Sequence, residues 1–115
     1  MKHEEILKQL NMRLMSAEEE LRLATGAVKA SKFSCNEMDS FIARSNEDLL
    51  KEMSDGTLTT ETVAAVMRWL GRARHQLNES ASKIMASHAE RRGEVESLRW
   101  IAGSLSNQGS DEEDK

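Results

Sequence analysis

Several residue types are absent or rare in the 115-residue sequence, and this reduces the number of fold classes that the chain could adopt. There is no proline and no tyrosine, and only 3% of the residues are aromatic. β-Branched residues are sparse beside the leucine, methionine, alanine, glutamate, lysine and arginine that favour helix. A β-sheet is therefore not expected. A chain of this length forms one domain at most, and an elongated helical arrangement would bury only a thin core, so self-association is expected.

Disulfides, targeting segments and membrane spans are also missing. Cys35 is the single cysteine, so no disulfide can form within the chain. The N-terminal residues lack the basic, apolar and small-residue order of a signal peptide, and charged residues interrupt every apolar stretch before ~18 residues. These features predict a soluble, cytoplasmic protein without a membrane partner. The net charge of −4 argues against a protein that coats nucleic acid, although a local basic patch can still bind it.

Apolar residues recur in the first half of the chain at alternating steps of three and four, which is typical of a helix that packs along one seam. The first part of this seam comprises Leu7, Leu10, Leu14, Ala17, Leu21, Ala24 and Val28. The same steps continue through Ser31, Cys35, Met38, Ile42, Ser45 and Leu49. Against continuity, Gly26 weakens the helix and Ser34-Cys35-Asn36-Glu37 has the pattern of a capping box. One helix over residues 3–54 and two helices over residues 3–31 and 35–54 both remain open.

The strongest stop signal is Asp55-Gly56, because glycine commonly follows a helix end. Thr59 has the character of an N-cap, with Glu61 in the first turn, so the next helix is predicted over residues 60–104. Its seam comprises Val63, Val66, Leu70, Ala73, Leu77, Ala81, Ile84, His88, Arg91, Val95, Leu98, Ala102 and Leu105. Two consecutive steps of four, from Ala73 to Ala81, resemble a coiled-coil stutter.

These elements predict an all-α fold, either an antiparallel long-helix hairpin or a three-helix, coiled-coil-like bundle. Residues 1–105 would form the single helical domain. Residues 106–115 contain no apolar side chain and several acids, which predicts a disordered acidic tail.

Candidate catalytic and metal-binding groups are few. His75 and Glu79 are one helical turn apart, but no third metal ligand is near them in the sequence. Cys35 could act with His75 or His88 as a nucleophile and base, yet no motif brings them together. The sequence therefore predicts no catalytic residue, no metal site and no cofactor.

Two polar residues interrupt the second seam, and two tryptophans lie beside it. His88 and Arg91 occupy seam positions where polar side chains can set register or partner choice, unless this stretch has no neighbouring helix. Together with Leu98, Trp100 and Ile101, they form the predicted partner-binding surface. Trp100 is expected to anchor a partner protein on this surface. Trp69, which lies beside Leu70, is expected to be a core residue.

The preferred function is a non-enzymatic protein–protein interaction module, such as an adaptor, assembly factor, chaperone or inhibitor, that acts as a homodimer or larger homo-oligomer and binds another protein. The alternative is a nucleic-acid-associated regulator that contacts phosphates through Arg68, Arg72 and Arg74.

Overall fold

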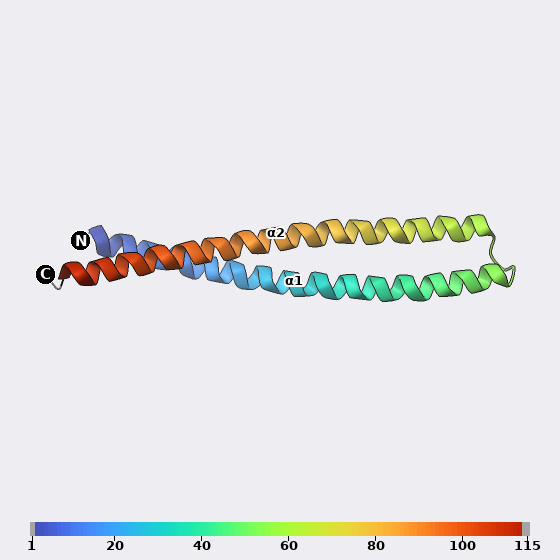
Figure 1. The fold of residues 1–115 in the computed structure, drawn as a ribbon, viewed down its shortest axis with the longest axis horizontal. Coiled ribbons are helices and arrows are strands. Elements are labelled where there is room, and N and C mark those ends of the chain that lie inside the picture. Colours follow the sequence, from blue (N-terminus) through green and yellow to red (C-terminus); the bar gives the residue numbers. More distant parts are fainter. Residues whose placement is uncertain (1, 114–115) are drawn as a thin grey trace. The chain divides into compact units, whose positions relative to one another are not determined.

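The computed structural model describes residues 2–113, which form two α-helices, α1 (Lys2–Ser54) and α2 (Thr60–Glu113), joined by a short connection (Figure 1). No strand occurs within these residues, so the all-α prediction is confirmed. α1 runs through residues 30–34 without interruption, and the three-helix alternative is wrong. A single glycine and a capping pattern do not end a helix whose buried seam continues on both sides.

The second helix is longer than expected. α2 continues through Glu113, past the predicted end near residue 104. Most of the predicted acidic tail falls on residues 108–115, whose side chains lie outside what the structure describes. The disorder of this tail therefore stays a prediction. Within the described residues, neither helix contains a stretch long and apolar enough to cross a membrane.

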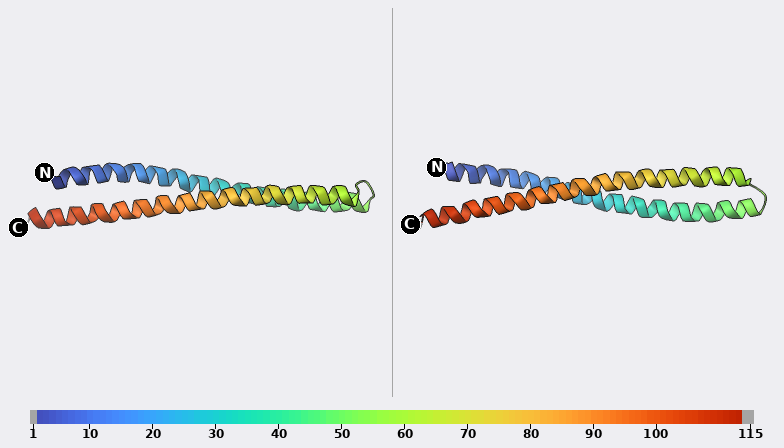
Figure 2. Two further views of the ribbon diagram at one scale, coloured as in Figure 1. Left: turned by 90° about the horizontal axis from the view of Figure 1, so that it is seen from above. Right: turned by 45° about the horizontal axis from the view of Figure 1, so that its top comes forward.

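The chain divides into two compact units, each of which pairs a segment of α1 with a segment of α2. Unit 1 comprises Met1–Ala27 and Met85–Lys115, and unit 2 comprises Val28–Ile84. Within each unit the two helical segments run side by side in opposite directions (Figure 2).

The chain reverses within unit 2 at the predicted position. Thr57 N donates to Glu52 O at 2.9 Å and Gly56 N donates to Met53 O at 3.1 Å, which is the Schellman pattern of a helix C-terminus. Gly56 takes a φ of 80°, a left-handed conformation that glycine adopts at little cost. Thr59 then caps α2, because its Oγ1 accepts a hydrogen bond from Thr62 N at 3.2 Å.

The predicted seams are the faces along which α1 and α2 pack. Every described seam position is buried or half-buried, including the polar positions of α1 such as Ser31 and Ser45. Few of these side chains are fully enclosed. The buried hydrophobic residues are Ala17, Val63, Leu70, Val95 and Ala102. The fully buried core is therefore small, and the half-buried seam residues, many of them leucines, supply most of the apolar area that the seams remove from water.

Trp69 is a correction to the sequence-based expectation. Its side chain is 63% exposed, whereas the neighbouring Leu70 is 3% exposed and holds the core position. One residue along a helix rotates the side chain by about 100°, which is enough to move Trp69 off the seam. The assignment of Trp69 to the core is therefore wrong.

Candidate interaction surface

His88 faces α1 inside unit 1. Its Nε2 atom lies 3.1 Å from Thr25 Oγ1, and Thr25 Oγ1 also lies 2.9 Å from the carbonyl oxygen of Leu21. A carbonyl oxygen only accepts, so the threonine hydroxyl donates its one proton to Leu21. His88 Nε2 must therefore carry a hydrogen and donate it to Thr25.

Arg91 belongs to a closed group of four charges, which we call the charge quartet and which consists of Arg13, Glu20, Arg91 and Glu94. Arg91 donates to Glu20 at 2.8 Å, and Arg13 donates to Glu94, so both bonds link α1 to α2. Arg13 lies 3.8 Å from Glu20 along α1, and Arg91 lies 4.0 Å from Glu94 along α2. Each charge therefore has two neighbours of opposite sign.

The remainder of unit 1 also has cross-helix contacts. Arg99 donates to Glu18 at 3.3 Å, and His3 Nε2 donates to the carbonyl oxygen of Leu105 at 2.6 Å. α1 therefore covers this half of α2, and the interpretation that His88 and Arg91 lack a neighbouring helix is wrong. Both residues have partners within the chain. Their role in binding another protein stays a prediction.

The other three predicted partner-binding residues divide between two faces of α2. Leu98 is a half-buried seam residue. Trp100 is 73% exposed and Ile101 is 38% exposed, and together with Glu96 and Ser97 they line a shallow surface groove. Of the predicted residues, these two carry the apolar surface that a partner could reach.

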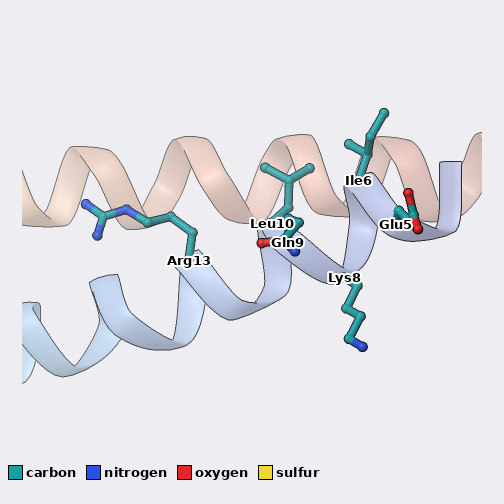
Figure 3. A pocket seen from close by; sticks show the side chains of 6 residues that line it. All are labelled: Glu5, Ile6, Lys8, Gln9, Leu10 and Arg13. Carbon is teal, nitrogen blue, oxygen red and sulfur yellow. The ribbon is translucent and has the colours of Figure 1, made fainter. Parts of the chain in front are cut away.

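A wider hollow lies on the α1 segment of the same unit (Figure 3). Its volume is about 860 Å³, and its lining residues are Glu5, Ile6, Lys8, Gln9, Leu10 and Arg13. Ile6 and Leu10 project to one side of α1, whereas Lys8 projects to the opposite side (Figure 3). Ile6 is 51% exposed, so the hollow presents apolar surface to water.

Large apolar side chains are more often exposed than buried among the described residues. The exposed ones are Ile6, Met12, Met15, Leu23, Phe33, Phe41, Leu50, Trp69, Met85, Trp100 and Ile101. Seven of these eleven belong to unit 1, whose seam contains the polar His88 and Arg91. Unit 1 therefore has half-buried polar residues on its seam and large apolar side chains on its outer surface.

The basic region predicted to contact nucleic acid lies in unit 2, and one of its arginines is engaged within the chain. Arg74 Nε donates to Asp39 Oδ1 at 2.5 Å and Arg74 Nη2 donates to Asp39 Oδ2 at 3.2 Å, a two-pronged pair between α2 and α1. Its Nη1 also contacts Asn78 and lies 3.6 Å from Cys35 Sγ. The hydrogen bond from Arg74 lowers the pKa of Asp39.

Arg68 and Arg72, by contrast, are exposed, as is Trp69 beside them. His75 Nε2 lies 3.1 Å from Glu79 Oε1 on the exposed side of α2. Within residues 2–113, no cluster of three or more histidine, cysteine, aspartate or glutamate side chains is arranged to hold a metal ion.

Neither the hollow nor the charge quartet was predicted from the sequence. The quartet had a sequence signal, because Arg13 and Glu20 each precede a residue of the α1 seam and Glu94 precedes Val95 of the α2 seam. Charged residues at such flanking positions commonly pair between coiled-coil helices. The hollow had no comparable signal, since it depends on the directions of particular side chains. No protein-family model, curated protein or solved structure matches the chain.

Proposed function

We propose that this chain is a non-enzymatic helical protein–protein interaction module that works in the cytoplasm as a homo-oligomer, in the class of adaptors, assembly factors, chaperones and inhibitors. The observation that carries the proposal is the exposure of large apolar side chains, above all Trp100. Exposed apolar surface of this kind marks interaction sites, and tryptophan is enriched among the residues that dominate binding energy.

The accessible surface of the chain supports the same proposal. It amounts to 8733 Å², whereas a compact monomer of 12.9 kDa exposes about 6,300 Å². Specific interfaces remove ~800 Å² from each partner, and obligate dimers often remove more. The chain therefore has enough surplus surface for a large interface.

The test compares two baits in an affinity capture from the source cells, with bound proteins identified by mass spectrometry. The wild-type chain should retain a defined protein partner, and Trp100→Ala should lose it while keeping the helical circular dichroism spectrum of the wild type. Identical sets of captured proteins from both baits would contradict a role for Trp100.

A nucleic-acid-associated regulator is the alternative, and the exposure of Arg68, Trp69 and Arg72 on one stretch of α2 favours it. Exposed arginines and an aromatic ring are the groups that bind single strands. Fluorescence anisotropy with a labelled single-stranded oligonucleotide tests it. Binding that falls steeply with salt and disappears in Arg68→Glu/Arg72→Glu would support it. No binding at low salt would exclude it.

A further inference from the structure

We propose that the outer face of α2 in unit 1 packs against the same face of a second copy of this chain, in the antiparallel sense and centred on Gly93. The outer face consists of the residues that lie opposite the α2 seam in this unit, which are Ala86, Ala89, Gly93, Glu96, Trp100 and Gly103. The inference rests on the homo-oligomer proposed above and names its interface.

The outer face is a second seam on the back of α2. Each of its residues lies two positions before a residue of the seam that packs on α1, from Ala86 before His88 to Gly103 before Leu105. Two positions turn a helix by about 200°, so the two seams lie on opposite sides of α2. All residues of the outer face are exposed, and Trp100 is 73% exposed.

The outer face carries little charge for the outside of a helix, which is normally polar and charged. Glu96 is its one charged residue. The corresponding face of α1 in the same unit is mostly charged and consists of Glu5, Lys8, Met12, Met15, Glu19 and Arg22. The outer face of α2 therefore has the composition of a surface that packs against another helix.

Gly93 lies where a second helix can come close. A Cβ added at this position meets no atom within 4 Å, so the packing of unit 1 does not require a glycine here. Glycine also weakens a helix relative to alanine. On an exposed face, however, it allows another backbone to approach, because the distance between packed helices depends on the side chains at the contact. Gly93 is therefore suited to the centre of a helix–helix contact.

The spacing around Gly93 favours a second copy as the occupant. A two-fold axis that crosses the helices at Gly93 brings each residue level with the one equally far on the other side of Gly93 in the second copy. Trp100, seven residues after Gly93, comes level with Ala86 of the second copy, and both lie on the line of Gly93 because seven residues are close to two turns. Ala89 of the second copy comes level with Ser97, which lines the groove beside Trp100. The large side chain thus meets small ones twice, as a self-complementary interface requires.

The charges near the centre are also self-complementary. Glu96 lies three residues after Gly93 and Arg92 one residue before it, so the two are about 40° apart around α2, on the same edge of the face. Both are exposed. In the antiparallel pair, Arg92 of each copy lies about 3 Å along the axis from the level of Glu96 of the other copy. Opposite charges therefore meet twice, which contributes register and specificity more than raw affinity.

Disulfide formation tests this geometry directly. In a chain with Cys35→Ser, Gly93→Cys places a thiol at the two-fold axis, beside the same thiol of the second copy. Gly103→Cys is the matched control, because it lies on the same face but its two copies would be about 30 Å apart along the axis. Mild oxidation should link Gly93→Cys chains rapidly and Gly103→Cys chains only slowly, as read from non-reducing gels.

Sedimentation equilibrium measures the dimer dissociation constant for wild type, Trp100→Ala and Gly93→Gln. Trp69→Ala and Gly71→Gln are the matched controls, since both positions are exposed but lie in unit 2. We expect a wild-type dimer, association weakened roughly 30-fold or more in Trp100→Ala and roughly tenfold or more in Gly93→Gln, and no comparable change in the controls. Circular dichroism of dilute, monomeric samples should show Gly93→Gln at least as helical as wild type, because glutamine favours helix over glycine.

Charge reversal tests the contact between Glu96 and Arg92 of different copies. Glu96→Arg alone and Arg92→Glu alone should each associate more weakly than wild type, because like charges then meet. A mixture of the two variants should recover association, since the heterodimer pairs opposite charges at both contacts. Effects confined to one helix would not be reversed by mixing.

Three outcomes would overturn the inference and differ in what they say about the proposed function. A wild-type dimer that Trp100→Ala and Gly93→Gln leave unchanged would mean that another face joins the copies, and the homo-oligomer would stand. Equal disulfide formation through Gly93→Cys and Gly103→Cys would contradict the antiparallel arrangement, again without removing the homo-oligomer. A wild-type chain that stays monomeric at micromolar concentrations and above would remove both the inference and the homo-oligomer.

Discussion

His88 Nε2 donates a hydrogen bond to Thr25 Oγ1 across unit 1, with 3.1 Å between the two atoms. The threonine hydroxyl donates its one proton to the carbonyl oxygen of Leu21, so its oxygen can only accept from the imidazole of His88. His88 thereby occupies a seam position without leaving its Nε2–H unpaired. Polar groups that are paired in this way can fix the register of a helix pair.

Thr25→Val should destabilise the protein by about 1 kcal/mol, because the half-buried His88 loses its acceptor. Thr25→Val combined with His88→Leu should recover that loss, since no polar group then remains unpaired at this seam position. Urea denaturation of the four members of the double-mutant cycle measures the coupling. Strictly additive effects would show that the hydrogen bond contributes nothing to stability.

Trp69→Ala and Leu70→Ala should differ sharply although the two residues are neighbours. Leu70 is a buried seam residue, and its truncation should cost about 2–5 kcal/mol. Trp69 is largely exposed, so its truncation should change the free energy of unfolding by less than about 1 kcal/mol. Thermal melts of both variants test this difference. Equal losses of stability in the two variants would show that Trp69 makes a buried contact.

Two glycines should respond to alanine with opposite signs. Gly56→Ala should destabilise by about 1 kcal/mol, because a side chain at a φ of 80° is strained. Gly71→Ala should stabilise by up to about 1 kcal/mol, because Gly71 lies within α2 and an added Cβ meets no atom within 4 Å. Denaturant midpoints of the two variants test this contrast directly.

The pair between Asp39 and Arg74 predicts a pH effect with a definite sign. The hydrogen bond from Arg74 lowers the pKa of Asp39 in the folded chain, so the pair stabilises the fold above the ordinary aspartate pKa of about 3.9. That contribution is lost as the pH falls from there through the lowered pKa. Carbon-13 NMR titration should place the Asp39 transition below about 3.9 in the wild type.

Arg74→Gln is the control for this titration. Without the guanidinium, the Asp39 transition should move up towards about 3.9. Glu19 offers an internal comparison, because a hydrogen bond from Arg22 lowers its pKa and is unaffected by the change at Arg74. An Asp39 transition that stays in place in Arg74→Gln would show that Arg74 does not cause the lowered pKa of Asp39.

Much of the fold could be predicted from the sequence, because the packing faces of the helices follow from the spacing of apolar residues and the helix ends follow from local capping residues. The alternating steps of three and four identified the half-buried positions of both helices, even where the residue is Ser31 or Arg91. Asp55-Gly56 and Thr59 marked the reversal because their preferences are local. Gly26 and the capping-box pattern left the continuity of α1 open, because packing along the seam can override a local propensity.

The candidate surface was less accessible from the sequence. Trp69 and Trp100 both lie near seam residues in the sequence, but each is one or two residues off the seam, and the rotation of about 100° per residue turns both side chains away from the other helix. In the sequence, Arg74 could not be distinguished from Arg68 and Arg72 as a possible phosphate contact. In the structure it pairs with Asp39, which is 35 residues away in the sequence. Such long-range pairs depend on how α1 and α2 are aligned against each other, which the sequence pattern of either helix does not specify.

The reversal at Gly56 has a kinetic consequence. Contacts in unit 2 close comparatively short loops, as between Asp39 and Arg74, whereas the bond from His3 to Leu105 spans 102 residues. Loop-closure entropy rises with the length of chain enclosed, and local contacts form faster. We therefore expect unit 2 to nucleate folding and unit 1 to close towards the chain ends afterwards. Native-state hydrogen exchange should consequently be slowest near Leu70 and fastest near His3 and Leu105.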